Sequence, residues 1–207
     1  MSKLKLYTFP LSGHSHRVEL MLSLLSLDAE LIKVDLAKGE HKSAEFLAKN
    51  PAGQVPVLED GDITLADSNA IIMYLATKYD QGRTWYPEDL VTQTKIQSYL
   101  SLAAGKLAFG PCNARIINVF GKPLDKEFAL TLAHDLLTLL DQTLSSQTWL
   151  VGDTPTLADV AHYTYIAHAP EGDVSLENYP HIKTWLATIE QLKGFVPMPK
   201  TKTGLTA

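Results

Sequence analysis

The cysteine content limits the thiol chemistry that this chain can do by itself. Cys112 is the only cysteine among the 207 residues. One cysteine excludes an internal disulfide, a Cys-x-x-Cys redox pair and a cysteine-based zinc site. Thiol chemistry at this protein therefore needs a thiol that another molecule supplies, and we interpret Cys112 as a bystander.

Two segments place a hydroxyl at a turn into an expected helix. Ser12-Gly13 follows an apolar stretch, and Asp67-Ser68 precedes a later apolar helix. Both segments have the composition of a turn or a helix cap, so neither one requires a function. A helix start also attracts anions, because its first N–H groups and the helix dipole favour negative charge. Each segment is therefore a candidate anion contact as well as a cap.

Three basic side chains follow the first of these turns. His14 and His16 have no metal-ligand partners at useful spacing, so we interpret them as packing or solvated histidines. Arg17 is expected to form an ion pair inside the domain, with Asp67 or with Glu19 as its partner.

Hydrophobic periodicity predicts an α/β domain in the first 80 residues. Seven segments read in order as strand, helix, strand, helix, strand, strand and helix, over residues 4–9, 14–27, 29–36, 43–48, 57–59, 63–66 and 68–79. Asp60-Gly61-Asp62 between the two short strands is a strong hairpin signal. This order is typical of a thioredoxin-like domain, with helices on both faces of a mixed sheet.

Strand signals vanish in the second half of the chain. The polar stretch Tyr79–Glu88 is interpreted as a linker. Four later segments have helical periodicity, over residues 92–107, 126–144, 157–167 and 182–192. Gly110-Pro111 is expected to separate the first two helices, and Thr156 with Asp159 has the form of a capping box. We expect a thioredoxin-like domain over residues 1–80 and an all-helical domain over residues 89–207.

Charge and hydropathy exclude several classes of function. The chain carries 18 Lys and Arg against 23 Asp and Glu, for a net charge of −5, and no short window is strongly basic. These values disfavour a nucleic-acid partner. No apolar run is long enough to span a membrane, and the start Met1–Tyr7 lacks the apolar core of a secretion signal. We therefore expect a cytoplasmic protein without a membrane partner.

Longer motifs occur in order along nearly the whole chain. In the first half they are Gly39–Lys42 (GEHK), Asn50–Gly61 (NPAGQVPVLEDG) and Ala66–Ile71 (ADSNAI). In the second half they are Val151–Asp159 and Tyr179–Met198. Together these segments resemble the glutathione transferases, and among them the bacterial members and the serine-type members of the phi and theta kinds. The resemblance implies a thioredoxin-like glutathione-binding domain followed by an all-α domain.

The resemblance also implies a glutathione pocket in the first domain. Glutathione carries two carboxylates, one ammonium and a thiol, so its pocket must present separated cations and anions. The implied contacts are His41 and Lys42 with the glycyl carboxylate, Gln54 with the glycyl end, the Val55 main chain with the cysteinyl residue, Asp67 with the γ-glutamyl ammonium, and Ser68 with the γ-glutamyl carboxylate.

Three residues compete to stabilise the glutathione thiolate. Ser12 is favoured because its spacing to Arg17 is that of the catalytic serine in phi-like members. Ser15 lies one turn further on and stays open as an alternative. Tyr7 is expected to be structural, because the alignment with tyrosine-using members places Thr8 at the tyrosine position. A shift of one residue turns a strand side chain to the other face of the sheet.

The pocket for the second substrate is expected between the domains, where small-molecule sites are common. We expect Phe9 and Leu11 on one side of this pocket and Phe109 and Asn113 on the other.

The function that follows is conjugation of reduced glutathione to small apolar electrophiles by thiolate attack. Glutathione is then a co-substrate, and no metal or prosthetic group is expected. The resemblance also implies a homodimer. Two alternatives use the same fold: a glutathione-dependent peroxidase, isomerase or dehalogenase, and a non-catalytic glutathione-binding or regulatory protein.

Overall fold

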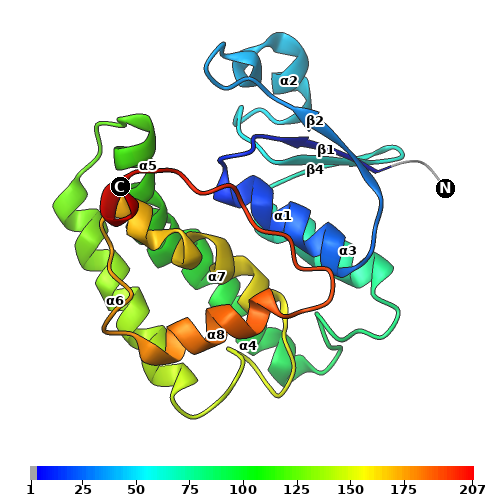
Figure 1. The fold of residues 1–207 in the computed structure, drawn as a ribbon. Coiled ribbons are helices and arrows are strands. Elements are labelled where there is room, and N and C mark those ends of the chain that lie inside the picture. The colour runs from blue at the N-terminus through cyan, green and yellow to red at the C-terminus, as the bar shows by residue number, and fades with distance from the viewer. Residues whose placement is uncertain (1–3) are drawn as a thin grey trace. The chain divides into compact units, whose positions relative to one another are not determined.

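The computed structural model describes residues 4–207 (Figure 1). Residues 1–3 lie outside the described residues. They belong to the N-terminal stretch Met1–Tyr7, on which the prediction of a cytoplasmic location partly rests. Two compact units account for the chain. The first takes the residues up to Gly82 together with Lys193–Pro199, and the second takes Arg83–Leu192 together with Lys200–Ala207.

The first unit is the predicted α/β domain. Its elements are β1 (Leu4–Thr8), α1 (Gly13–Leu24), β2 (Ala29–Lys33), the 3-10 turn η1 (Glu40–Lys42), α2 (Ala44–Lys49), β3 (Val57–Asp60), β4 (Ile63–Ala66) and α3 (Ser68–Tyr79). The four strands form one sheet in the order β2-β1-β3-β4, in which β1 runs parallel to β2 and antiparallel to β3. The expected mixed sheet and thioredoxin-like fold class are confirmed.

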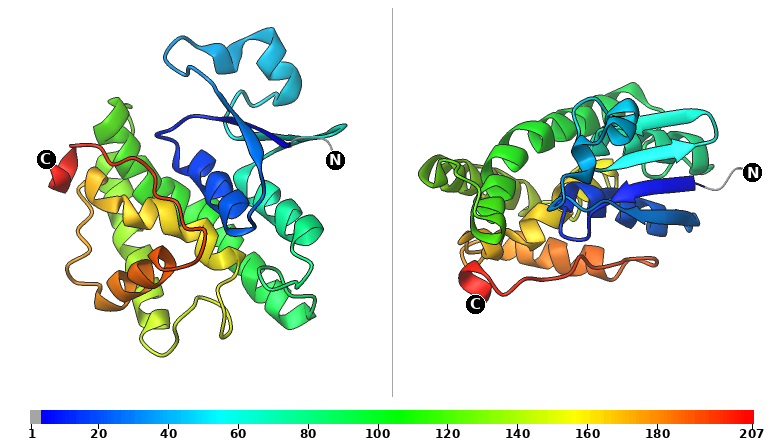
Figure 2. Two further views of the ribbon diagram at one scale, coloured as in Figure 1. Left: turned by 45° about the vertical axis from the view of Figure 1, so that its right-hand side comes forward. Right: turned by 90° about the horizontal axis from the view of Figure 1, so that it is seen from above.

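Helices cover both faces of this sheet, as Figures 1 and 2 show, with α1 and α3 on one face and α2 on the other. Leu4, Leu6 and Thr8 alternate as the buried side chains of β1. On the α2 side, Phe46 packs into a small core with Val57 of β3. Burial of these apolar side chains fixes which face of each strand points inward.

The segment Lys193–Pro199 packs in the first unit, although the sequence analysis placed it in the domain of residues 89–207. His16 Nε2 donates a hydrogen bond to the Val196 carbonyl at 2.9 Å. Gly194 has a φ of +90°, and a Cβ there would lie 2.7 Å from the Ser23 carbonyl oxygen. These contacts join residues far apart in the sequence, so periodicity gives no signal for them.

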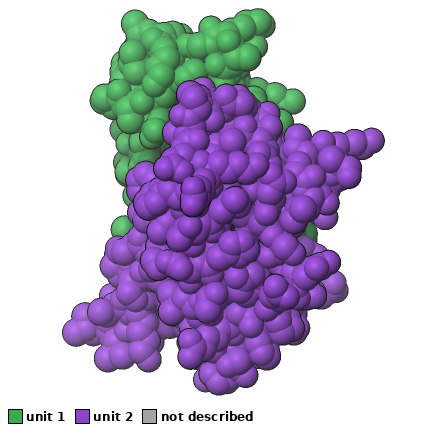
Figure 3. All heavy atoms as spheres, turned by 90° about the vertical axis from the view of Figure 1, so that its left-hand side faces the viewer, with its two compact units in different colours: residues 1–82, 193–199 green, residues 83–192, 200–207 purple. Residues whose placement is uncertain are grey.

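The second unit is all-helical, as expected, and Figure 3 colours its atoms purple. Its elements are α4 (Leu90–Leu102), the π-helix η2 (Ala103–Cys112), α5 (Asn113–Phe120), α6 (Lys126–Leu144), α7 (Leu157–Ala167), η3 (Ala169–Gly172), α8 (Pro180–Glu190) and η4 (Gly204–Thr206). No helix within residues 4–207 is both long enough and apolar enough to cross a membrane.

The helix that begins at Leu90 does not end near Gly110-Pro111, as the sequence analysis expected. It continues through η2 into α5. In an α-helix the ring of Pro111 would clash with the carbonyl four residues earlier, and the wider π turn moves that carbonyl away. Gly110 contributes as well, because a Cβ there would lie 2.7 Å from the Ala133 nitrogen of α6. Gly110 therefore lets η2 and α6 approach each other closely.

Candidate functional site

The sheet register brings the predicted site segments to one edge of the sheet. Tyr7 of β1 lies opposite Val57 of β3, and Val57 lies opposite Ala66 of β4. The loop after β1, the segment before β3 and the turn after β4 therefore leave the sheet side by side. These three connections carry Ser12, Val55 and Ser68.

Ser12 is the N-cap of α1. Its Oγ accepts a hydrogen bond from the Ser15 N–H at 3.2 Å, and its carbonyl accepts one from the His16 N–H at 2.9 Å. The side chain is half-buried. Because capping uses an oxygen lone pair, the hydroxyl proton can still be donated to an anion at the helix start.

Ser15 is completely buried, with no exposed surface. Its Oγ accepts a hydrogen bond from the Phe9 N–H at 3.3 Å and so ties the β1–α1 loop to the helix. A hydroxyl without exposed surface does not reach a bound molecule unless the loop moves. The geometry therefore favours Ser12 over Ser15.

Tyr7 and Thr8 point to opposite faces of the sheet, as the sequence analysis expected. The Tyr7 hydroxyl donates to Glu59 at 3.2 Å, and its ring packs edge-on against Phe46 at 6.2 Å between centroids. Thr8 is buried and donates to the carboxylate of Glu19. Tyr7 thus faces α2, as a structural residue would.

Asp67 is the N-cap of α3, and Ser68 is the first residue of that helix. Asp67 Oδ1 accepts a hydrogen bond from the Ala70 N–H at 2.9 Å. Its φ of 72° is uncommon for a residue with a side chain and costs about 1–3 kcal/mol, so the fold must hold it there. The Asp67 side chain is exposed, whereas Ser68 is buried. The first-turn N–H groups of α3 form a start that suits an anion.

Arg17 contacts the first turn of α3, whereas the sequence analysis expected Asp67 or Glu19 as its partner. Its buried guanidinium donates to Ser68 Oγ at 2.8 Å and to Asn69 Oδ1 at 2.8 Å. The difference arises because the packing of α1 directs Arg17 at the first turn of α3. Sequence reasoning missed this role for Asn69, since no local pattern records a contact between two helices.

His14 completes the group at the start of α3. Its Nδ1 lies 3.2 Å from Ser68 Oγ and 3.4 Å from a guanidinium nitrogen of Arg17. Burial, and then the positive charge of Arg17, lower the pKa of His14 to about 3. The imidazole is therefore uncharged at neutral pH. Among residues 4–207, no group of three or more His, Cys, Asp or Glu side chains is placed to hold a metal ion.

Lys42 in η1 reaches the loop before β3. Its Nζ donates to the Ala52 carbonyl at 3.2 Å and to the Gly53 carbonyl at 3.0 Å. Gly53 has a φ of +58°, and a Cβ there would lie 2.7 Å from that same Nζ. His41 is half-buried beside Lys42 in this turn. The structure therefore brings the two expected cations together with the loop that leads to Gln54.

Gln54 and Val55 precede β3 and follow this loop. The Gln54 side chain is exposed, and its carbonyl accepts a hydrogen bond from Asn50 Nδ2 at 2.8 Å. The Val55-Pro56 peptide bond is cis. The two residues thus leave the sheet at the edge that also carries Ser12 and Ser68.

The four residues expected around a second substrate lie in different units. Phe9 and Leu11 belong to the β1–α1 loop of the first unit and are half-buried. In the second unit, Phe109 of η2 is 55% exposed and Asn113 begins α5. A shared pocket for these residues stays a prediction.

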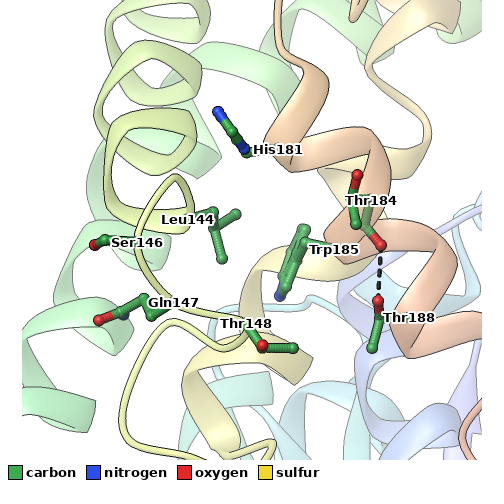
Figure 4. A pocket seen from close by; sticks show the side chains of 8 residues that line it. All are labelled: Leu144, Ser146, Gln147, Thr148, His181, Thr184, Trp185 and Thr188. Carbon is green, nitrogen blue, oxygen red and sulfur yellow. Dashed lines mark hydrogen bonds between the residues drawn. The ribbon is translucent and has the colours of Figure 1, made fainter.

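A cleft of about 320 Å³ lies elsewhere in the second unit, between the end of α6 and α8 (Figure 4). It is lined by Leu144, Ser146, Gln147, Thr148, His181, Thr184, Trp185 and Thr188. Thr184 and Thr188 donate their hydroxyl protons to main-chain carbonyls of α8, at 3.1 and 2.8 Å. These hydroxyls are explained by their own helix, and the cleft contains none of the predicted site residues.

Comparison with known proteins finds two family models in this chain. Residues 2–77 match "Glutathione S-transferase, N-terminal domain", and residues 114–193 match "Glutathione S-transferase, C-terminal domain". Glutathione S-transferase 3 of Zea mays is 33% identical, over 96% of this chain and 97% of that protein.

Solved structures give the same picture. A glutathione S-transferase from Pseudomonas fluorescens is 30% identical, with a TM-score of 0.90 over 96% of this chain and all of its own. A glutathione transferase homolog from Drosophila mojavensis, solved with bound glutathione, is 31% identical, with a TM-score of 0.85 over 93% of this chain and 89% of that one.

Proposed function

This chain belongs to the glutathione S-transferase family and is a glutathione transferase; from that premise we propose that Ser12 stabilises the thiolate of bound glutathione for attack on a small apolar electrophile. The observation that carries the proposal is the place of Ser12. It caps α1 at the edge of the sheet where the predicted peptide contacts also gather, and its cap uses only the oxygen.

The energy that this role requires is within reach of one hydroxyl and one helix start. A free thiol titrates near ~8.5, and each unit of pKa depression needs about 1.4 kcal/mol. Lowering the thiol pKa by about two units therefore needs about 3 kcal/mol. A hydrogen bond to a charged group contributes about 1.5–3 kcal/mol and a helix N-terminus about 0.3–1 kcal/mol. Together the two account for the shift.

The peptide part of glutathione would lie along the same edge. Lys42 donates two of its three N–H groups to main-chain carbonyls, and the third can be donated to the glycyl carboxylate. His41 lies beside Lys42 and would contact the same carboxylate. Gln54 and the Val55 main chain would contact the glycyl end and the cysteinyl residue. Asp67 is exposed and suits the γ-glutamyl ammonium.

Ser68 would meet the γ-glutamyl carboxylate through its main-chain N–H. Its hydroxyl is buried and turned toward Arg17, so the side chain contributes less directly than the resemblance implies. The start of α3 provides the remaining attraction for the carboxylate.

The reaction then needs little else from the protein. The thiol proton is lost to solvent when glutathione binds as the thiolate. The sulfur lone pair forms a C–S bond to the electrophilic carbon, and a leaving group departs or a π bond opens to take the electron pair. Holding both reactants in one site and supplying the thiolate at neutral pH are the two sources of rate enhancement.

An ultraviolet difference titration of the glutathione complex tests this proposal, because it measures thiolate directly. The wild type should show thiolate near neutral pH. Ser12→Ala should bind glutathione and lose the thiolate signal, with Ser15→Ala as the matched control that keeps it. Loss of the cap in Ser12→Ala costs about 1 kcal/mol of stability, so thermal unfolding should accompany the titration.

A bound glutathione with an unshifted thiol would contradict the catalytic role and favour a non-catalytic glutathione-binding protein. The expected homodimer and the electrophile pocket belong to the same proposal. Sedimentation of the purified chain tests the dimer, and rates with a series of electrophiles test the pocket.

A further inference from the structure

We propose that His14 is a positioning residue for the γ-glutamyl end of glutathione, because its uncharged Nδ1 holds Ser68 and Arg17 in place at the start of α3. This inference rests on the proposed function. It concerns a side chain that the sequence alone assigns to packing.

The contacts favour one position for the proton on the His14 ring. Arg17 donates to Ser68 Oγ at 2.8 Å, and the same guanidinium nitrogen lies 3.4 Å from His14 Nδ1. A guanidinium has donors and no acceptor, so the Nδ1 that faces it must be an acceptor. We therefore assign the proton of the neutral ring to Nε2.

The direction of the Ser68 hydroxyl follows from this assignment. Ser68 Oγ lies 3.2 Å from His14 Nδ1, and Nδ1 has no proton to donate. Ser68 therefore donates its hydroxyl proton to His14 while its oxygen accepts from Arg17. Ser68 is thereby held from two sides, by His14 and by Arg17, and these three side chains form one polar group between α1 and α3.

The group formed by His14, Arg17 and Ser68 has a consequence for an anionic ligand. Arg17 is 1% exposed, so its charge is kept beneath the first turn of α3, where the charge and the helix dipole add. An uncharged acceptor at position 14 holds the guanidinium there without competing for the ligand carboxylate. The pKa of His14, lowered to about 3 by burial and by Arg17, agrees with an uncharged ring.

The role is specific to one end of glutathione, and that makes it testable. Cysteinylglycine has the thiol and the glycyl carboxylate of glutathione and lacks the γ-glutamyl group. Loss of His14 should therefore lower kcat/KM for glutathione and leave kcat/KM for cysteinylglycine nearly unchanged. A comparison of two thiols on one protein sample cancels any loss of folded enzyme.

Three variants separate the two nitrogens of the ring. His14→Asn keeps an acceptor close to the position of Nδ1, His14→Gln keeps a donor close to the position of Nε2, and His14→Ala keeps neither. With an activated chloroarene as electrophile, His14→Ala and His14→Gln should lower kcat/KM for glutathione about ten-fold, through KM rather than kcat. His14→Asn should stay within about three-fold of the wild type.

Two results would contradict the positioning role of His14. An equal loss for both thiols would show a merely structural role for His14, and rescue by His14→Gln in place of His14→Asn would assign the role to Nε2. Either result overturns the inference and leaves the proposed function standing. A wild type that does not use glutathione at all overturns the proposed function first, and the inference with it.

Discussion

Replacing Asp159 by alanine should destabilise the helical unit by about 3–5 kcal/mol. Asp159 is 1% exposed. Its Oδ1 accepts from the Leu150 N–H at 3.0 Å and from Trp185 Nε1 at 2.9 Å, and its Oδ2 accepts from the Thr156 N–H at 2.8 Å. Asp159 and Thr156 also form the predicted capping box at the start of α7.

The magnitude follows from the donors that alanine would leave behind. Three buried N–H groups would lose their acceptor, at about 1–3 kcal/mol each, and the bond from the Thr156 N–H is the part of the capping box that Asp159 supplies. Part of this loss is offset, because burying the carboxylate is itself unfavourable. Burial raises the pKa of Asp159 despite its hydrogen bonds. A net loss in the lower half of the summed range, about 3–5 kcal/mol, is therefore expected.

Asp159→Asn provides a graded comparison. The amide keeps one oxygen for Leu150 and Trp185, and it sets an NH₂ group against the Thr156 N–H, so the loss should be about 2 kcal/mol. Asp135 on α6 provides the matched control. It is more than half exposed in its ion pair with Lys106, and Asp135→Ala should change stability by less than about 0.5 kcal/mol.

Urea unfolding followed by tryptophan fluorescence measures these differences in the stability of the helical unit. The three tryptophans, Trp85, Trp149 and Trp185, all belong to the second unit. Their signal therefore reports the helical unit even if the two units unfold separately. The reasoning is refuted if Asp159→Ala lies within about 1 kcal/mol of the wild type, or if Asp159→Asn is the more damaging change.

Two further predictions follow from the same structure. Gly110→Ala should destabilise the helical unit by about 1–3 kcal/mol, because its Cβ would lie 2.7 Å from the Ala133 nitrogen, and urea unfolding measures the loss. Gly105→Ala is the matched control in the same π-helix; its Cβ would meet nothing within 4 Å, so it should be neutral or stabilising. The third perturbation is pH. The pKa of His14 is about 3 in the folded chain, against an ordinary value of 6.5 for a solvated histidine, so the unfolded chain binds more protons between these values. Stability should therefore fall as the pH falls from about 6.5 to 3, by up to about 1.4 kcal/mol per unit, and His14→Asn should remove that part of the slope in urea midpoints. If stability depends on pH in the same way in His14→Asn as in the wild type, the lowered pKa of His14 is contradicted.

Local features of the fold could be predicted because a few neighbouring residues encode them. The range predicted for α3 agrees with the structure, and the hairpin around Gly61 and the cap at Thr156 form as their sequences indicate. Alternation and helical periodicity record burial on one face of an element, and caps satisfy the N–H groups of a single helix end. The motifs of both domains likewise pointed to the family that the comparisons show.

The continuation of the helix through Pro111 could not be predicted in the same way. Proline and glycine together are a strong local signal for a break. The structure keeps the helix because a π turn accommodates the proline and because α6 approaches closely at Gly110. The second of these causes lies on another helix, beyond the reach of a local pattern.

The sequence by itself determined the fold class, the elements of the first unit and a set of candidate site residues, since each rests on local spacing or on a motif. Tertiary structure decided how far these residues and their neighbours are buried and which partners they contact. It buried Ser15 and left Ser12 half-buried, and it directed the guanidinium of Arg17 to Ser68 and Asn69 at the start of α3. It also joined His14 to Ser68 across 54 positions of sequence. The physical reason is that burial and hydrogen-bond partners depend on which elements pack together, and that packing is a property of the whole folded unit.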